Sequence, residues 1–327
     1  MTVDTLFLGG TSIDIIQNRQ KGRDALTFST SIGGSITNSC IIAAKLGLKI
    51  GLLSKIGKDT LGDYAIGFLK SLKIDTSGII QDLSIRTPLA IAKIDKSGIA
   101  KYAFYKNSPK DSVVPIKHAP EYLLNTCKVF HIGSSYSYQK NTFEETLKFV
   151  KCLKKRNVFI VYDPNIRPVG LMGNISVKNK VLKLLKLADL VKLSEIDLEY
   201  LTGHKSPEKG LSKLEKSVHC PIVLTLGPKG SIYYHLNRVG CLKQPTRFIK
   251  IPAFKVKVAD TIGAGDAFTA GLIYKFIKQG KTRFFSNIKS NMIFASAVSA
   301  IICTKKGSHE ALKNTQQVKL FLSNRTS

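Results

Sequence analysis

One stretch toward the C-terminal end, residues 258–276, constrains the fold more than any other part of the chain. Its sequence is VADTIGAGDAFTAGLIYKF, which places Gly263 and Gly265 immediately before a run of apolar residues at helical spacing. Residues 248–258 alternate enough to predict a strand. Glycines between a strand and a helix let backbone N–H groups approach a ligand closely, and the helix N-terminus adds about half a positive charge. The stretch therefore predicts an anion site where a helix begins.

An acidic side chain, Asp266, occurs at the same point of the sequence. A carboxylate is a poor ligand for an anion, but as a base it would take the proton of a hydroxyl held between it and a nucleotide's terminal phosphate. The amides of Gly263, Ala264 and Gly265 would then neutralise the charge that grows on the phosphoryl oxygens. The alternative is that Asp266 caps the helix, a common position for Asp. The residues alone leave both interpretations open.

Residues 260–268, DTIGAGDAF, resemble without a gap the C-terminal signature of the ribokinase-like carbohydrate kinases, the PfkB family. The resemblance implies that Asp266 is the catalytic base and that the amides of residues 263–265 form the hole for the transferring phosphoryl group. It also implies that Asp260 helps to bind a monovalent cation, K⁺, beside the nucleotide. For Asp266 the resemblance favours the base over the cap.

Two N-terminal segments resemble the sugar-binding part of the same family. The first predicted strand ends in glycines and is followed by Asp14, at the position of the family's early Asp, which binds sugar hydroxyls. The pair Gly33 and Gly34 precedes a predicted helix at residues 35–46, and Asn38 in that helix offers a donor and an acceptor to vicinal hydroxyls. By resemblance these four residues bind the sugar.

Residues 87–111 contain two β-rich runs separated by Asp-Lys-Ser-Gly, a pattern that predicts a hairpin. Together with residues 15–31 they would form the small β lid that family members fold over the sugar. Such a lid keeps water away from the phosphoryl group. Tyr105 and Lys106 resemble the sugar-contacting segment of fructokinases, with Lys at the position of an Arg.

Residues 163–168, DPNIRP, follow another predicted strand and resemble a run found in fructokinases and 2-keto-3-deoxygluconate kinases. Asn165 can hydrogen-bond a phosphate or sugar oxygen, and Arg167 can clamp a phosphate through two N–H groups. Ribokinases and nucleoside kinases usually lack the full run. The segment therefore favours a keto-sugar as the acceptor.

Residues 221–230, PIVLTLGPKG, resemble the nucleotide loop of the family. They are not a Walker A sequence, because no Gly-Lys-Ser/Thr follows at the required spacing. Farther back, Asp197 stands where the family has an acid that orders water around Mg²⁺, and Glu195 is an alternative for that position. By resemblance the ATP-binding residues are Thr225, Gly227, Gly230, Gly265 and Gly307.

The 327 residues, of which 43% are hydrophobic, suffice for the core of one large domain or two smaller ones. Strand-like and helix-like segments alternate, which implies a parallel sheet with right-handed crossovers. No break in composition divides the chain. We expect one ribokinase-like domain over residues 1–327: a doubly wound, mostly parallel sheet with helices on both faces, and the β lid.

The formal net charge of +28 raises nucleic acid as a partner. Most of this charge is Lys in amphipathic patterns such as residues 151–156 and 182–187, whose Lys faces are expected in solvent. We therefore expect no specific nucleic-acid partner. The chain has no apolar run of about 18 residues and no signal-peptide pattern, so we expect no membrane association and a cytoplasmic location.

Together these motifs predict an ATP-dependent sugar kinase that binds a small-molecule sugar, ATP, Mg²⁺ and K⁺, with fructose as the expected sugar. A 2-keto-3-deoxygluconate kinase, a ribokinase and a nucleoside kinase are alternatives within the same class. A non-catalytic sugar sensor or a basic nucleic-acid binder is the alternative from another class. An exposed edge of the lid sheet would also allow a homodimer.

Overall fold

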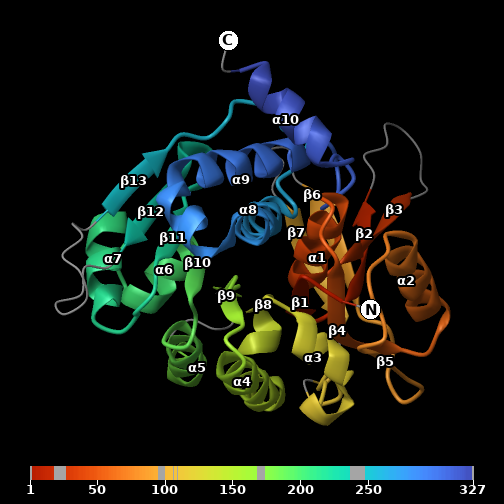
Figure 1. Cartoon of the computed structure of the whole chain (residues 1–327). Helices are drawn as coiled ribbons and strands as arrows, with labels where there is room; N and C mark the ends of the chain where they lie inside the picture. Colours follow the sequence, from red (N-terminus) through yellow and green to blue (C-terminus); the bar gives the residue numbers. More distant parts are fainter. Residues whose placement is uncertain are drawn as a thin grey trace.

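The computed structural model contains a large and a small β-sheet with helices around them (Figure 1). Within the part of the chain that it describes, the large sheet has nine strands and the small sheet four. The predicted α/β class with a separate small sheet is confirmed. The described residues are 2–17, 27–94, 100–105, 107–108, 110–167, 174–235 and 247–325.

Neighbouring strands of the large sheet are parallel from one edge, β5, as far as β11, and the last two pairings, β11 with β12 and β12 with β13, are antiparallel. The predicted mostly parallel sheet is therefore confirmed. In sheet order the strands are β13 (Arg247–Ile251), β12 (Ser231–His235), β11 (Ile222–Thr225), β10 (Leu190–Ser194), β9 (Phe159–Asp163), β8 (Val129–Gly133), β1 (Thr5–Leu8), β4 (Ile50–Gly57) and β5 (Ile79–Asp82).

Helices cover both faces of this sheet, and each face has its own apolar core. In β1, Leu6 and Leu8 pack in one core while Phe7 packs in the other, as expected for a strand buried on both sides. One face carries α3 (Glu121–Thr126), α4 (Lys140–Lys155), α5 (Ile175–Leu185), α6 (Glu195–Thr202) and α7 (Pro207–Glu215). The other carries α1 (Ser35–Lys45), α2 (Thr60–Ser71), α8 (Ala264–Ser286), α9 (Ile288–Ile302) and α10 (Thr315–Ser323).

The start of α1 is fixed by a close approach of two backbone segments. Gly34, the N-cap, has φ of 98°, and a Cβ atom there would lie 2.3 Å from the carbonyl oxygen of Gly10. Only glycine fits such a position. The predicted helix at residues 35–46 is confirmed apart from its last residue, and Gly47 follows it with φ of 92°.

The strand predicted over residues 248–258 is correct only at its beginning. β13 ends at Ile251, and residues 252–258 lie outside any strand. Pro252 follows directly and has no N–H group to donate to a neighbouring strand, which explains the end. The chain then runs without regular structure to the predicted glycine turn, and α8 begins at Ala264.

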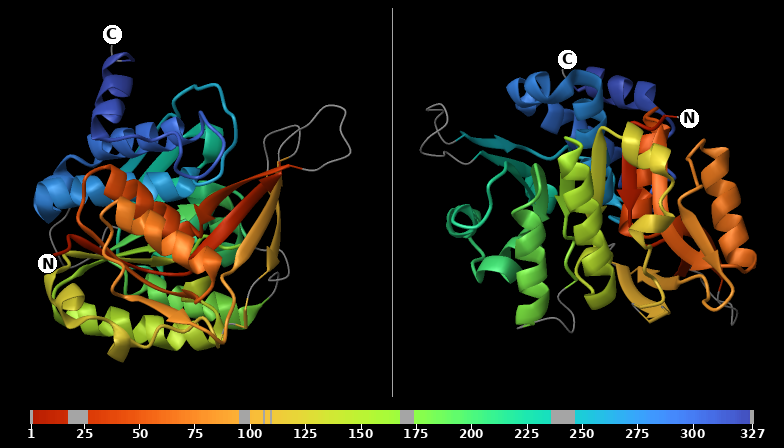
Figure 2. Two further views of the ribbon diagram at one scale, coloured as in Figure 1. Left: turned by 90° about the vertical axis from the view of Figure 1, so that its right-hand side faces the viewer. Right: turned by 60° about the horizontal axis from the view of Figure 1, so that its bottom comes forward.

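The small sheet lies apart from the large one and extends away from it (Figure 2). Its order is β3 (Phe28–Gly33), β2 (Ser12–Gln17), β6 (Leu89–Ile94) and β7 (Ala100–Tyr105). β6 and β7 pair antiparallel, so the predicted hairpin is confirmed, although residues 95–99 lie outside the described ranges. Residues 18–26 of the other predicted lid segment also lie outside them. That this sheet closes as a lid over a single domain stays a prediction.

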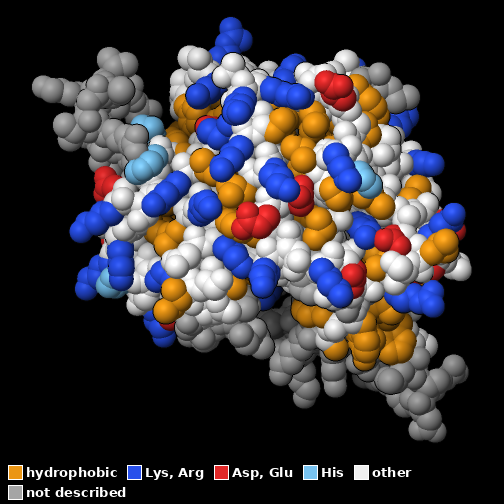
Figure 3. Space-filling model, turned by 90° about the horizontal axis from the view of Figure 1, so that it is seen from below, with side chains coloured by type: hydrophobic (Ala, Val, Ile, Leu, Met, Phe, Trp, Pro, Cys, Tyr) orange, Lys and Arg blue, Asp and Glu red, His pale blue; other side chains and the backbone are white. Residues whose placement is uncertain are grey.

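The surface carries many more basic than acidic side chains (Figure 3). Lys side chains of the amphipathic helices α4 and α5 are in solvent as predicted, among them Lys151, Lys155, Lys183 and Lys186. None of the described helices has the length and apolarity that a membrane span requires.

Candidate active site

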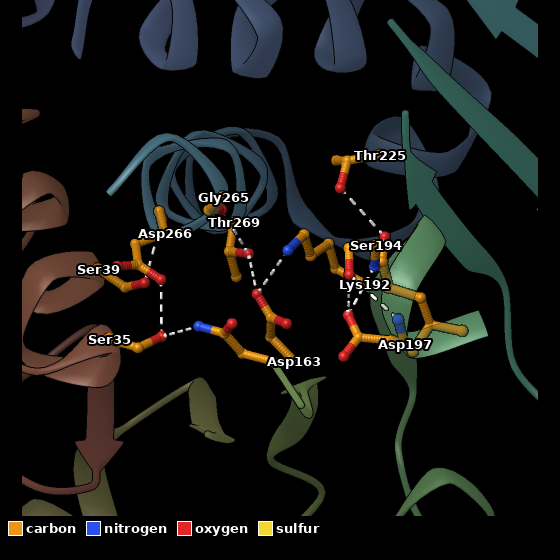
Figure 4. A network of polar contacts seen from close by, with 12 residues as sticks. Ser35, Ser39, Asp163, Lys192, Ser194, Asp197, Thr225, Gly265, Asp266 and Thr269 are labelled. Atoms are coloured by element: carbon orange, nitrogen blue, oxygen red, sulfur yellow. Dashed lines mark hydrogen bonds and ion pairs between the residues drawn. The ribbon is translucent and has the colours of Figure 1, made fainter. Parts of the chain in front are cut away.

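Polar side chains from four elements meet at the N-terminal end of α8 (Figure 4). Asp266 lies in the first turn of α8, and Ser35 begins α1. Asp163 ends β9, and Lys192 lies in the neighbouring strand β10. Since parallel strands end at the same edge of a sheet, β9 and β10 bring these residues together. The cluster is built from segments that are far apart in the sequence.

The N-terminus of α8 presents backbone N–H groups to a ligand. Gly263 is its N-cap with φ of 76°, and a Cβ atom there would lie 2.5 Å from the carbonyl oxygen of Ser308. Among the described residues, the N–H groups of Gly263 and Gly265 make no hydrogen bond, and that of Ala264 makes a long one, 3.3 Å, to the Thr261 carbonyl. All three residues of the turn are partly exposed. These amides are therefore available to an anion.

Asp266 is buried, and each of its carboxylate oxygens accepts a hydrogen bond from α1. Ser35 Oγ donates to Oδ1 at 2.6 Å, and Asn38 Nδ2 donates to Oδ2 at 3.0 Å. The N-cap of α8 is Gly263 and no side chain caps it, so the capping interpretation of Asp266 is wrong. Burial raises the pKa of Asp266 above its ordinary value, although the two hydrogen bonds lower it. An oriented carboxylate with a raised pKa is suited to act as a base.

A buried ion pair lies beside the first turn of α8. Lys192 Nζ is 3.1 Å from Asp163 Oδ2, to which Thr269 Oγ1 also donates at 3.2 Å. Burial lowers the pKa of Lys192, but nearby carboxylates, Asp163 first, outweigh burial and raise the pKa, so the ammonium group is charged. A Cβ atom on Gly265 would lie 3.0 Å from Lys192 Nζ, which puts this charge next to the available amides. Asp163 Oδ1 is buried and has no partner among the described residues.

The carboxylate of Asp14, on β2, lies against β3 of the same small sheet. A Cβ atom on Gly33 would lie 1.9 Å from Asp14 Oδ1, so the glycine is needed for this approach. Burial raises the pKa of Asp14 to about 7, and the charge of Asp266 contributes to the shift, while a hydrogen bond from Ser12 Oγ at 3.3 Å opposes it. The effect of the Asp266 charge on the pKa of Asp14 indicates that Asp14 lies near the predicted base.

Two residues predicted to contact substrate, Asn38 and Asn165, form hydrogen bonds with other residues of the protein. Asn38 Oδ1 accepts a hydrogen bond from Ser308 Oγ at 2.9 Å, in addition to the bond that its amide donates to Asp266. Asn165 has φ of 41°, and its Nδ2 donates to Ser35 Oγ at 2.8 Å. Both Asn side chains are thus part of the frame around Asp266. Their contacts with substrate stay predictions.

Of three other predicted residues, two are exposed and one lies outside the described ranges. Tyr105 is on β7, opposite Leu89, and is 61% exposed. Arg167 is exposed and ends the described range 110–167. Lys106 lies outside the described residues. The predicted contacts of all three with sugar or phosphate stay predictions.

The two acids predicted to serve cations each bind backbone groups. Asp260 is fully buried and accepts from the N–H groups of Ile262 at 2.9 Å and Gly307 at 2.8 Å, so it joins the loop before α8 to the loop after α9. Asp197 forms a capping box with Ser194 and accepts from the Ile166 N–H at 2.6 Å. These bonds give both carboxylates a structural role. Their roles at K⁺ and Mg²⁺ stay predictions, and the described residues hold no His, Cys, Asp and Glu cluster that would bind a metal by itself.

The residues predicted for the nucleotide loop lie in the turn between β11 and β12. Gly227 and Gly230 have φ of 55° and 98°, and a Cβ atom on Gly230 would lie 2.0 Å from the Ile251 carbonyl oxygen. Thr225 Oγ1 donates to the carbonyl of Leu193 at 3.2 Å, which connects the end of β11 to β10 (Figure 4). The turn is therefore attached to the strand that carries Lys192. Binding of ATP by these residues stays a prediction.

Sequence reasoning missed several residues of the cluster. A Lys in the apolar segment LVKLS of β10 could have been noticed, because a lysine in a fully buried strand needs a buried partner. Asp163 lies inside a motif whose other members were selected, and a strand-end acid was a sufficient signal. Ser35 and Thr269 gave no signal in the sequence, because hydroxyl residues are common in helices and the contacts depend on the fold.

Comparison with known proteins agrees with this geometry. A family model described as "pfkB family carbohydrate kinase" matches residues 4–315. Fructokinase-1 of Zea mays is 30% identical over 301 residues, which cover 90% of this chain and 89% of the relative. The structure of a fructokinase with bound ATP from Xylella fastidiosa matches with a TM-score of 0.85 at 22% identity, over 99% of both chains. The structure of a fructokinase from Vibrio cholerae O395, bound to fructose, ADP and calcium ion, matches with a TM-score of 0.85 at 24% identity, over 98% of this chain and 99% of the other.

Proposed function

This chain belongs to the pfkB family of carbohydrate kinases and is a sugar phosphotransferase, and from that premise we propose that it transfers the γ-phosphoryl group of ATP to a hydroxyl of fructose. The observation that carries the proposal is the position of Asp266. Its oriented, buried carboxylate lies in the same helical turn as the available amides of Gly263 and Gly265. A base and an anion site are the two groups that transfer to an alcohol requires.

Asp266 would remove the proton of the acceptor hydroxyl. Burial raises its pKa, which makes the carboxylate a stronger base than an exposed Asp, while the donors on α1 keep it oriented. Each carboxylate oxygen has a second lone pair, which remains for the hydroxyl. The alcohol oxygen then forms its bond to the γ-phosphorus as the bond from phosphorus to ADP breaks.

The residues at the start of α8 fit the phosphates of a nucleotide. Three groups of positive charge or partial charge lie together there: the available N–H groups of Gly263 and Gly265 and the ammonium of Lys192. They would hold the transferring phosphoryl group and neutralise charge as it moves to the leaving oxygen. Arg167, at an exposed position, would add a second cation, as the resemblance of its segment implies.

The site also fits a divalent cation, because Asp163 Oδ1 is buried beside the phosphate site and lacks a partner among the residues that the structure describes. We propose that Asp163 would help to hold Mg²⁺ there through water. Mg²⁺ would supply charge neutralisation on the phosphate oxygens when bound. Asp260 would serve K⁺ by holding together the loops before α8 and after α9, a role that rests on the resemblance of its signature.

Fructose is favoured over other sugars by the names of similar proteins and by one segment of the sequence. The curated relative from maize is named a fructokinase, and the similar Vibrio cholerae structure contains fructose. Residues 163–168 carry the run that resembles keto-sugar kinases. Asp14, with Gly33 against its carboxylate, would accept hydrogen bonds from sugar hydroxyls next to Asp266.

A panel of acceptors with coupled detection of ADP tests the acceptor. The panel contains fructose, 2-keto-3-deoxygluconate, ribose and a nucleoside, and we expect the highest kcat/KM for fructose. A higher value for another acceptor would replace fructose and leave the kinase assignment intact. ATP consumption with none of them, together with tight and salt-dependent DNA binding, would favour a nucleic-acid binder instead.

Replacement of the base tests the mechanism. We expect Asp266→Asn to lower kcat by about 10²–10⁴-fold, because a positioned base contributes that much, while calorimetry shows that the variant still binds ATP. The control is Asp63→Asn, which changes an exposed carboxylate on α2 and should leave kcat unchanged. Turnover of Asp266→Asn at nearly the normal rate would refute the role of this residue.

A further inference from the structure

The hydroxyl of Ser35 lies between two site residues and bonds to both. Ser35 Oγ donates to Asp266 Oδ1 at 2.6 Å and accepts from Asn165 Nδ2 at 2.8 Å (Figure 4 shows both hydrogen bonds at the Ser35 hydroxyl). A hydroxyl has a single proton, and the amide group of Asn165 can only donate at its nitrogen. The Ser35 proton is therefore committed to the carboxylate of Asp266.

The backbone holds both Ser35 and its donor Asn165 in place. Asn165 adopts a left-handed conformation, φ 41°, which is strained for a residue other than glycine and persists where its surroundings impose it. Ser35 directly follows Gly34, whose close approach to the Gly10 carbonyl fixes the start of α1. The strained backbone of Asn165 and the close contact of Gly34 thus both help to position the hydrogen bond from Ser35 to Asp266.

We propose that Ser35, held by Asn165, is a positioning residue that binds Oδ1 of Asp266 and thereby orients the carboxylate which takes the proton of the acceptor hydroxyl. The inference deepens the proposed function and rests on it. Ser35 does not itself gain or lose a proton: the hydroxyl proton of the sugar passes to Asp266, and the Ser35 bond favours the ionised form that receives it.

The charged groups around Asp266 decide how far this bond affects titration. The charge of Asp163 on β9 raises the pKa of Asp266, and that of Lys192 on β10 lowers it, while Asp266 in turn raises the pKa of Asp14 on β2. After burial, the Ser35 bond is the largest influence on the carboxylate, and it lowers the pKa. Its removal should therefore shift the protonation of Asp266 to higher pH.

The first experiment measures kcat and KM against pH for Ser35→Ala. A hydrogen bond to a charged group is stronger than one to a neutral group, so we expect the acid limb of the kcat profile to move up by about one to two pH units, with the sugar KM nearly unchanged. Ser35→Thr keeps a hydroxyl and should restore the normal profile. A raised sugar KM with an unmoved profile would instead make Ser35 a sugar ligand and overturn the proposal.

A matched control comes from the same helix. Ser39 Oγ donates to the backbone carbonyl of Asp266 at 3.1 Å and does not touch the carboxylate. Ser39→Ala removes a hydroxyl of the same size beside the same residue, and we expect its pH profile to coincide with that of the normal chain. If the acid limb of the kcat profile moves equally in Ser39→Ala and Ser35→Ala, the effect comes from loosened packing between α1 and α8. That result would also overturn the proposal.

The second experiment needs no turnover and separates this inference from the proposed function. The raised pKa of Asp266 lets the folded state keep a proton that the unfolded state has lost, so stability falls as pH rises between the two pKa values. The difference in unfolding free energy between the normal chain and Asp266→Asn, measured in urea as a function of pH, isolates this loss of stability. For Ser35→Ala compared with the double variant Ser35→Ala and Asp266→Asn, the loss should extend to higher pH. If the loss covers the same pH range with and without the Ser35 hydroxyl, the role of Ser35 is contradicted. If the range extends in Ser35→Ala but the chain phosphorylates no sugar, the hydrogen bond of Ser35 to the Asp266 carboxylate is supported and the proposed function is wrong.

Discussion

Asp14 and Asp266 are both buried carboxylates with raised pKa values, but their surroundings differ. Asp266 accepts short hydrogen bonds from Ser35 and Asn38, which fix its direction. Within the part of the chain that the structure describes, Asp14 accepts one long bond, 3.3 Å, from Ser12. Oxygens with fewer protein donors can accept bonds from a ligand. The difference supports the division of labour in which Asp266 is the base and Asp14 holds the sugar.

This division predicts a pH dependence of sugar binding. Because burial raises the pKa of Asp14 to about 7, with the charges of Asp266 and Glu310 adding to the shift, its ionised fraction rises between pH 6 and pH 8. Sugar hydroxyls donate to the ionised form, so the fructose KM should fall about tenfold as pH rises across this window. Asp14→Asn should raise the KM and flatten its dependence. The KM for ATP in the same assays is the control, and a fructose KM whose pH dependence survives in Asp14→Asn would contradict the assignment.

At the scale of single residues, the sequence predicted groups that belong to a local motif better than groups that belong to the fold. Asp266 and its neighbouring glycines were found because they are contiguous. Lys192 was missed because Lys usually indicates a solvent-exposed position, whereas here Asp163 on the adjacent strand neutralises it. Such a partner becomes visible only when the order of the strands is known.

At the scale of elements, the start of α8 determines the geometry of the anion site. The positive φ of Gly263 turns the chain into the helix, and the Ser308 backbone is packed where a side chain would be. Glycine at this position therefore serves both the turn and the approach of a neighbouring loop. The direction of the N–H groups at the start of α8 follows from that turn.

Gly263→Ala should impair activity more than stability alone would explain. The left-handed conformation costs Ala about 1–2 kcal/mol, and the new Cβ must also displace the Ser308 backbone, so we expect kcat/KM for ATP to fall at least tenfold. Gly47→Ala is the control, because its φ of 92° brings the same strain while nothing lies within 4 Å of the new Cβ. Gly47 follows the far end of α1, away from Ser35. Both variants are compared by urea unfolding and steady-state kinetics, and equal kinetic losses in the two would argue against the anion site.

The difference between a local motif and a feature of the whole fold also explains which elements were predicted well from the sequence. α1 and α8 have glycines at their starts and apolar residues at helical spacing, so both ends of α1 and the start of α8 were predicted nearly to the residue. The strand before α8 was extended too far because alternation continues past Pro252, although the sheet ends there. Alternation describes which side chains can be buried, whereas the length of a strand depends on whether a neighbour is present to pair with it.

At the scale of the whole molecule, the basic charge is dispersed over the surface, and one buried cation lies in the candidate site. The net charge is +28, and Lys side chains of α4 and α5 are exposed along the surface. In the described residues, Lys192 is a buried cation next to the free amides of α8. A positive molecule attracts an anionic nucleotide from a distance and leaves a neutral sugar unaffected. The charge therefore has a consequence for one substrate only.

Ionic strength should consequently affect the two substrates differently. The range of electrostatic attraction shrinks from about 30 Å at 0.01 M to about 8 Å at 0.15 M salt, so we expect kcat/KM for ATP to fall several-fold over this range while the fructose KM changes little. The salt is NaCl at constant KCl and MgCl₂, so that a K⁺ requirement does not obscure the effect. A variant with Glu in place of Lys151, Lys155, Lys183 and Lys186 should show a weaker dependence, because these exposed residues on α4 and α5 act only through the long-range field. Parallel changes for ATP and fructose, or an unaltered dependence in that variant, would mean that the dispersed charge does not assist nucleotide binding.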